Sequence, residues 1–203
     1  MPGLLGESSL LAFGRPRRVV AFAASAGGLS ALSHILSALP AGFAAPILVV
    51  QHLDQKHRSW LAEILARRSR LRVEQVRGGE RLASGVVYVA PPGRHLLVAA
   101  DGELSLSDTG RVQYVRPSAD VLFASLAESW GSGAIAVVLT GTGSDGANGV
   151  RAIKSQGGTV LVQDEASAEF FGMPDAAIRT GTADRILPLD AIAACLMELT
   201  AGG

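Results

Sequence analysis

Three residues with the side chains of an acyl-transfer site each follow an apolar run of the sequence. Ser25 follows residues 18–24, His52 follows residues 46–51, and Asp145 lies in the glycine-rich segment after residues 134–139. A serine hydroxyl is a weak nucleophile at neutral pH, so it needs a histidine to accept its proton and a carboxylate to orient that histidine. Their order along the chain is no obstacle, because such a triad is defined by geometry. If the fold brings them together, these residue types predict a serine hydrolase.

Each of the three residues also has a structural interpretation. Ser25 could be an ordinary turn or cap residue, His52 a hydrogen-bonded structural histidine, and Asp145 the cap of the helix that follows it. Their common position after apolar runs favours the chemical interpretation for all three. Gly27 and Gly28 would let the chain turn sharply into a helix, whose free N–H groups favour a developing oxyanion.

The elements that must position these residues alternate between strands and helices. Residues 1–16 read as an N-terminal extension, and residues 17–203 as one catalytic domain. Apolar runs and helical periodicity predict strands at 18–24, 46–51, 71–76, 134–139 and 158–163, and helices at 29–39, 59–69, 118–130, 146–155 and 189–199. Residues 86–90, 94–99 and 103–107 are too closely spaced for helices between them and predict an antiparallel insertion.

This alternation predicts a three-layer α/β/α domain with a mostly parallel, Rossmann-like sheet and a short antiparallel insertion. Ligands of such open sheets bind beyond the carboxyl ends of the strands. Residues that directly follow the strands are therefore where chemistry is expected.

Composition excludes several other classes of protein. The chain has 203 residues, 48% of them hydrophobic, and 18 basic residues balance 18 acidic ones. This balance gives no general electrostatic reason to bind nucleic acid. A small basic cluster before the first strand is interpreted as solvent-exposed: Arg15, Arg17 and Arg18. The apolar run that follows is interrupted at Ser25 and the next glycines, so it is too short for a signal peptide or a membrane span. We therefore expect a cytoplasmic protein without membrane insertion.

The remaining histidines and the cysteine predict no metal site. Cys195 is the single cysteine, so it forms no intrachain disulfide and reads as a core residue. His34 falls within a predicted helix, His57 at the start of one and His95 in the antiparallel insertion, so all three read as surface or packing residues. No histidine and acidic cluster has metal-ligand spacing.

The glycine-rich segment also supports a competing hypothesis. Gly141-x-Gly143-x-x-Gly146 matches the fingerprint of a dinucleotide-binding turn, and Asp164 lies near where a ribose-binding acid is expected. Against this, the fingerprint normally follows the first strand, whereas here it comes late in the chain. A dinucleotide enzyme would also leave Ser25 and His52 unexplained.

Six segments occur together and in order, and they carry a family resemblance. They are Phe22-Ala-Ala-Ser25-Ala-Gly-Gly28, Val49-Val-Gln-His52, Tyr88-Val-Ala-Pro-Pro-Gly93 with His95, Arg116-Pro-Ser-Ala-Asp120-Val-Leu-Phe123, Leu139-Thr-Gly-Thr-Gly-Ser-Asp-Gly146 and Phe171-Gly-Met-Pro174. Over residues 17–200 the chain resembles the catalytic domain of CheB-type protein-glutamate methylesterases of bacterial chemotaxis.

The resemblance implies an activity and the roles of its residues. Such enzymes hydrolyse γ-glutamyl methyl esters on the cytoplasmic helices of chemoreceptors and release methanol, without a cofactor, and many also deamidate receptor glutamines. By position, Ser25 matches the nucleophile, His52 the base and Asp145 the orienting acid, while the backbone at Thr142 and Ala26 matches the oxyanion hole. The family usually has serine or threonine at the position of Ala26 and methionine at that of Thr142. Both departures bear on efficiency and substrate choice.

Two further expectations follow from this resemblance. Family members typically carry an N-terminal receiver domain of about 100 residues or more, whereas fewer than 20 residues precede the first predicted strand here. We therefore expect that this chain is not gated by a receiver of its own and that any regulatory protein acts in trans. Ala26 and Thr142 also fit a catalytically weakened receptor-binding or scaffold module, although a scaffold has no need of all three triad residues.

Overall fold

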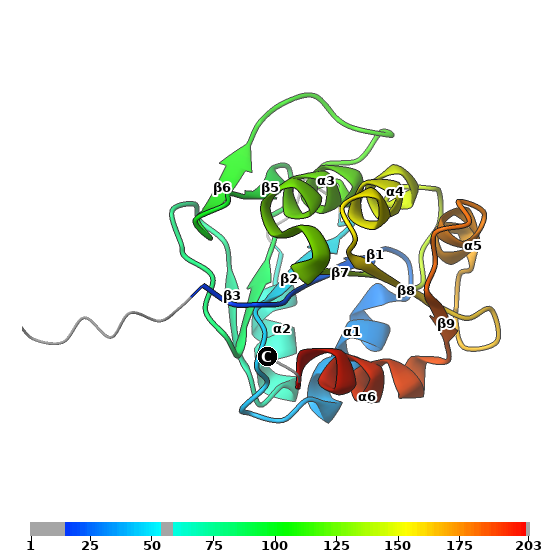
Figure 1. The fold of residues 1–203 in the computed structure, drawn as a ribbon, viewed down its shortest axis with the longest axis horizontal. Coiled ribbons are helices and arrows are strands. Elements are labelled where there is room, and N and C mark those ends of the chain that lie inside the picture. The colour runs from blue at the N-terminus through cyan, green and yellow to red at the C-terminus, as the bar shows by residue number, and fades with distance from the viewer. Residues whose placement is uncertain (1–14, 54–58, 202–203) are drawn as a thin grey trace, which may run out of the picture.

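A parallel sheet lies at the centre of the protein (Figure 1). The computed structural model describes residues 15–53 and 59–201. Within these residues the sheet has seven strands in the order β3-β4-β2-β1-β7-β8-β9, and all neighbours are parallel. The strands are β1 (Val19–Ala24), β2 (Ile47–Gln51), β3 (Arg72–Gln75), β4 (Val86–Val89), β7 (Ala134–Val138), β8 (Thr159–Gln163) and β9 (Arg185–Leu187).

Helices cover both faces of the sheet (Figure 1). They are α1 (Gly28–Ala38), α2 (Leu61–Arg68), α3 (Ala119–Trp130), α4 (Ala147–Ser155), α5 (Gly172–Ile178) and α6 (Leu189–Thr200). Helices α3, α4 and α5 pack on one face, and α1, α2 and α6 on the other. The predicted three-layer α/β/α architecture is confirmed.

Strand β1 is apolar at every position because helices cover both of its faces. All of its residues are buried. Val19, Ala21 and Ala23 contact the core under α3, whereas Val20, Phe22 and Ala24 contact the core under α1. A strand that is covered on both faces needs a continuous apolar run and not an alternating one.

The predicted antiparallel insertion is correct only in part. Strands β5 (His95–Val98) and β6 (Leu104–Ser107) form an antiparallel hairpin. Residues 86–90 were wrongly assigned to it, because β4 pairs in parallel with both β2 and β3. The spacing argument assumed a helix between parallel strands, but residues 76–85 connect β3 to β4 without one. Every residue of β4 is buried, as a central strand requires.

Two elements of the C-terminal part were missed in the sequence. Helix α5 has seven residues and begins with Gly172, and β9 has three residues. Neither is long enough to show a clear period. Strand β9 exists because it pairs with β8, a contact that its own sequence does not reveal.

The sheet has a switch point between β1 and β7. Strand β1 leads into α1 on one face, whereas its neighbour β7 leads into α4 on the opposite face. Open α/β sheets bind ligands beyond the carboxyl ends of the strands at such a switch point. Ser25 directly follows β1, and the loop with Asp145 follows β7.

Candidate active site

Ser25 lies on a sharp turn between β1 and α1. Its N–H donates to the Thr140 carbonyl at 3.0 Å, and its carbonyl accepts from the Gly28 N–H at 2.9 Å. Gly27 has φ +77°, which favours glycine. A Cβ on Gly28 would lie 2.0 Å from Gln51 Oε1, so this position has no room for a side chain. The Gly-Gly pair thus permits the turn that presents Ser25, as predicted.

His52 and Asp145 are joined by a hydrogen bond. His52 Nε2 lies 2.8 Å from Asp145 Oδ2, and the two side chains are 12% and 3% exposed. An ionised carboxylate only accepts hydrogen bonds, so Nε2 carries the ring proton and Nδ1 is left as the basic nitrogen. The histidine is thus oriented with an unprotonated Nδ1, which can accept a proton.

Asp145 binds the N-terminus of α3. Its Oδ1 accepts from Ser118 Oγ at 2.6 Å and from the Asp120 N–H at 3.1 Å, and its Oδ2 accepts from the Ala119 N–H at 2.6 Å. Burial alone would raise the pKa of Asp145, but the hydrogen bonds from His52, Ser118 and the α3 backbone lower it below its ordinary value. The carboxylate is thus held ionised beside His52.

The alternative that Asp145 caps the following helix is wrong. The residue before α4 is Gly146, and Asp145 instead caps the preceding helix, α3. Ser118 occupies the N-cap position of α3, but its hydroxyl donates to Asp145 and does not cap the backbone.

Ser25 and His52 are neighbours without a direct bond. The register of β1 and β2 pairs Ala24 with Gln51, the residues just before them, and the His52 N–H donates to the Ala24 carbonyl at 3.0 Å. Within the described part of the chain, no hydrogen bond joins Ser25 Oγ to His52. Catalytic hydrogen bonds of this kind often form only when substrate is bound.

Gln51 holds the backbone of both residues, and the sequence analysis did not identify it. Its buried Nε2 donates to the Ser25 carbonyl at 2.7 Å and to the His52 carbonyl at 3.1 Å. One amide group therefore ties the nucleophile turn to the histidine loop. The signal in the sequence was a polar residue ending a buried strand.

Replacing Gln51 with leucine is expected to leave both carbonyls without this donor. The Ser25 carbonyl keeps the Gly28 N–H as a donor, whereas the His52 carbonyl loses its side-chain donor. We expect the free energy of unfolding to fall by about 1–3 kcal/mol, the cost of an unsatisfied buried polar group, and ester hydrolysis to slow as the two loops separate. Denaturant unfolding and steady-state kinetics measure the two effects. Gln75→Leu, at the exposed end of edge strand β3, is the matched control and should change neither. Unchanged stability of Gln51→Leu would contradict this role.

The glycines after β7 serve close packing around Ser25. A Cβ on Gly141 would lie 2.4 Å from Met173 Sδ and 2.8 Å from Ser25 Cβ. A Cβ on Gly172, at the start of α5, would lie 3.1 Å from the Gly143 nitrogen. The loop therefore lies directly against the nucleophile turn and α5.

Two backbone N–H groups beside this packing are available as donors. Among the described residues, neither Ala26 N–H nor Thr142 N–H donates a hydrogen bond. Ala26 follows Ser25 directly, and Thr142 follows Gly141, which contacts Ser25. These are the groups that the resemblance assigns to the oxyanion hole.

The acid proposed for a dinucleotide site has a local partner. Asp164 Oδ1 accepts from the Ser167 N–H at 3.0 Å and from Ser167 Oγ at 2.6 Å, so it caps the turn after β8. These contacts account for Asp164 and Gly141 without a bound phosphate, and Gly143 and Gly146 have φ +87° and +99°, which favour glycine.

His34, His95 and Cys195 lie where packing or surface roles were predicted. His34 is half-exposed and lies 2.7 Å from Asp190. His95 is fully buried, with Nε2 3.0 Å from the Gly110 carbonyl and Nδ1 accepting from the Ser118 N–H. His57 lies outside the described residues. Cys195 is buried. In residues 15–53 and 59–201, no group of three or more His, Cys, Asp or Glu side chains could hold a metal ion.

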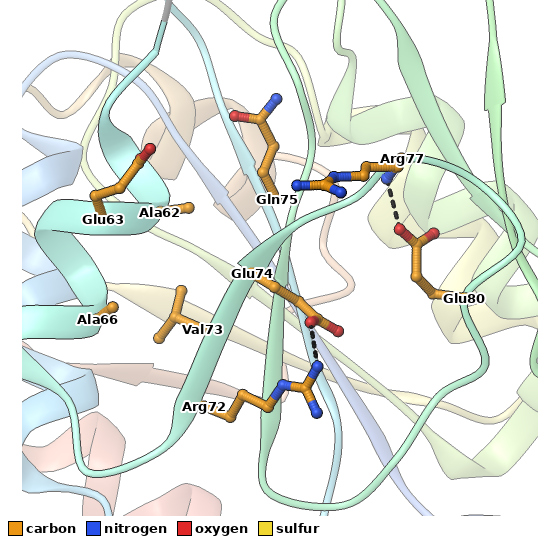
Figure 2. A pocket seen from close by; sticks show the side chains of 9 residues that line it. All are labelled: Ala62, Glu63, Ala66, Arg72, Val73, Glu74, Gln75, Arg77 and Glu80. Carbon is orange, nitrogen blue, oxygen red and sulfur yellow. Dashed lines mark hydrogen bonds and ion pairs between the residues drawn. The ribbon is translucent and has the colours of Figure 1, made fainter.

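A cavity of about 540 Å³ lies elsewhere, between α2 and the edge strand β3 (Figure 2). Its lining mixes acidic and basic side chains, with Arg72 and Glu74 paired at 2.8 Å. Glu80 accepts from the Arg77 N–H at 2.6 Å and so stabilises a turn. Ser25, His52 and Asp145 do not line this cavity, and its lining offers no nucleophile paired with a base.

The loops beyond β1, β2 and β7 thus place Ser25, His52 and Asp145 at one edge of an α/β sheet. The CheB methylesterase family model matches residues 20–196, and the chain belongs to this family. The predicted resemblance is thereby confirmed. In the described part of the chain, no helix is long and apolar enough to cross a membrane.

Individual relatives agree with this assignment. The chain is 48% identical over 182 residues to protein-glutamate methylesterase/protein-glutamine glutaminase 2 of Anaeromyxobacter dehalogenans, covering 90% of this chain and 53% of that protein. It is 42% identical over 183 residues to protein-glutamate methylesterase FrzG of Myxococcus xanthus, covering 90% and 55%. The chain thus spans about half the length of these curated relatives.

A solved structure matches over nearly its full length. The crystal structure of the Thermotoga maritima CheB methylesterase catalytic domain superposes with a TM-score of 0.86 at 38% identity, covering 90% of this chain and 98% of that one. The part of the relatives that this chain matches is therefore the catalytic domain.

Proposed function

We propose that this chain is a protein-glutamate methylesterase domain that hydrolyses γ-glutamyl methyl esters on the cytoplasmic helices of chemoreceptors. The observation that carries the proposal is the 2.8 Å bond between His52 and Asp145, next to Ser25 at the switch point of a CheB-family sheet. The relatives named as methylesterases supply the substrate class. We further propose that residues 17–203 form this catalytic domain and residues 1–16 an extension.

The reaction proceeds by acyl transfer through Ser25. Its Oγ attacks the ester carbonyl while His52 Nδ1 accepts the hydroxyl proton, and Asp145 stabilises the imidazolium that results. The N–H groups of Ala26 and Thr142 bind the oxyanion. The C–O bond to the methoxy group then breaks, and His52 returns the proton to give methanol.

Water completes the cycle. His52 accepts a proton from the water that attacks the glutamyl-enzyme, and Ser25 leaves with that proton as the glutamate side chain is released. The role of the backbone explains how Ala26 and Thr142 can replace the usual family residues, since an N–H donor survives a change of side chain. The Thr142 side chain is smaller and more polar than that of a methionine.

Deamidation of glutamine is a second activity of the same site. The name of the Anaeromyxobacter relative includes protein-glutamine glutaminase. The acyl-enzyme is the same for an amide substrate, with ammonia as the leaving group in place of methanol. The partner is a receptor helix in the cytoplasm for both reactions, and a regulatory protein would act on this domain in trans.

Methanol release from methylated chemoreceptor fragments of the same organism tests this function. We expect turnover by the purified chain and covalent labelling of Ser25 by a serine-reactive fluorophosphonate. Labelling without turnover on any methylated receptor would contradict the substrate. Failure of both would favour the catalytically weakened scaffold, which binds receptor without reacting.

A further inference from the structure

Two aspartates cap the N-termini of α3 and α4 reciprocally. Asp145, just before α4, binds the N-terminus of α3. Asp120, in the first turn of α3, binds the N-terminus of α4: its Oδ1 accepts from the Gly146 N–H at 2.9 Å and from the Gly149 N–H at 2.8 Å. The N-terminus of α3 therefore binds a carboxylate from the loop before α4, and the N-terminus of α4 binds a carboxylate from α3.

This reciprocal capping holds the backbone around Asp145. The backbone N–H that Asp120 binds at Gly146 belongs to the residue directly after Asp145. The N–H of Asp120 itself donates to Asp145 Oδ1 at 3.1 Å. Asp120 thus contacts Asp145 through its backbone and the peptide bond after Asp145 through its side chain.

A third contact joins Asp120 to the residue before Asp145. Gln113 Nε2 donates to Asp120 Oδ2 at 2.6 Å, and Gln113 Oε1 accepts from Ser144 Oγ at 2.6 Å. Gln113 has φ +48°, a conformation that non-glycine residues rarely adopt and that the surrounding contacts must maintain. Asp120 therefore holds the loop on either side of Asp145.

We propose that Asp120 is a positioning residue, which places the Asp145 carboxylate for its bond to His52. The inference rests on the proposed function, because it assigns Asp145 the role of orienting acid. Asp120 is 7% exposed and contacts His52 through no bond of its own among the described residues, so it acts through Asp145. A displacement of about 1 Å at a catalytic group can slow a reaction by about 100-fold.

The electrostatics indicate which substitution Asp120 tolerates. Burial raises the pKa of Asp120 above its ordinary value, the Gly149 N–H opposes this, and the nearby Asp145 charge raises the pKa further. An asparagine keeps an acceptor oxygen for Gly146 and Gly149 without the second charge. The NH2 group of that asparagine would face Gln113. The side-chain amide of Gln113 can flip, so that its oxygen accepts from this NH2 group.

The test compares Asp120→Ala with Asp120→Asn and with a control. Asp184→Asn is the matched control, because Asp184 also anchors this part of the fold through the Val160 N–H at 2.8 Å and an ion pair with Lys154, away from Asp145. Three quantities are measured on the full chain: the low-field proton NMR resonance of His52 Nε2–H, steady-state ester hydrolysis, and the unfolding midpoint. The resonance is assigned by its absence from His52→Ala.

We expect Asp120→Ala to lose or shift the His52 resonance and to lower kcat by about 10–100-fold with KM within about twofold. Asp120→Asn should keep the resonance and restore kcat to within about fivefold of the parent. Asp184→Asn should lower the unfolding midpoint while leaving the resonance and kcat in place.

Two results would overturn the proposal. One is an unchanged His52 resonance in Asp120→Ala, and the other is a loss of kcat no larger than that of Asp184→Asn at a similar midpoint. The NMR readout does not depend on the substrate. If the parent chain hydrolyses no methyl ester yet Asp120→Ala moves the resonance, the proposed function fails and the positioning role stands.

Discussion

Replacing Ser25 with alanine is expected to abolish methanol release, with kcat falling by about 10⁴-fold or more. Without the hydroxyl no acyl-enzyme forms, and only the oxyanion donors and substrate binding remain to accelerate the attack of water. Steady-state methanol release from a methylated receptor fragment measures the loss, and covalent labelling by the fluorophosphonate should disappear with it.

The same substitution should leave the fold intact. Ser25 is held by its backbone, through the Thr140 carbonyl, the Gly28 N–H and the Gln51 amide. Alanine preserves all of these, so the unfolding midpoint should match that of the parent. Ser30→Ala, on the exposed side of the first turn of α1, is the control and should retain full activity. Turnover by Ser25→Ala close to that of the parent would remove Ser25 as the nucleophile.

The position of Ser25, His52 and Asp145 could be predicted because it depends on local signals. Apolar runs mark the strands, and parallel strands present their carboxyl ends at one edge. The pairing of β1 with β2 and β7 then brings the three loops together. The order of the strands was not needed for this inference, only that these strands were parallel and buried.

Contacts that join distant segments could not be predicted in this way. The place of β4 in the parallel sheet depends on a connection without a helix. Gln51 and Asp120 looked like ordinary polar residues, because their partners lie on other elements. For the same reason the structural alternative for Asp145 named the next helix as the one it would cap, whereas it caps α3. Sequence periodicity reports the environment of an element and not the identity of its partners.

Replacing Asp145 with asparagine is expected to lower kcat by about 10⁴-fold, as the same change does in other triads. An asparagine can turn its amide N–H toward His52 Nε2, which then carries no proton. The ring proton moves to Nδ1, the nitrogen that must accept from Ser25. Steady-state kinetics on the methylated fragment measure the loss, and Asp190→Asn is the control, because Asp190 is an exposed carboxylate in the first turn of α6.

The same variant should also change how stability depends on pH. The pKa of Asp145 is lowered in the folded protein, so its carboxylate stabilises the fold above its unfolded pKa of about 3.9, and this contribution is lost as pH falls through the folded value. The free-energy difference between parent and Asp145→Asn should therefore be smallest in acid and reach a plateau above about pH 5. Its size should be about 2 kcal/mol, as for hydrogen bonds to a charged group. Urea unfolding between about pH 3 and 7 measures this difference, and a value that does not change with pH would show that the ionised carboxylate does not hold α3.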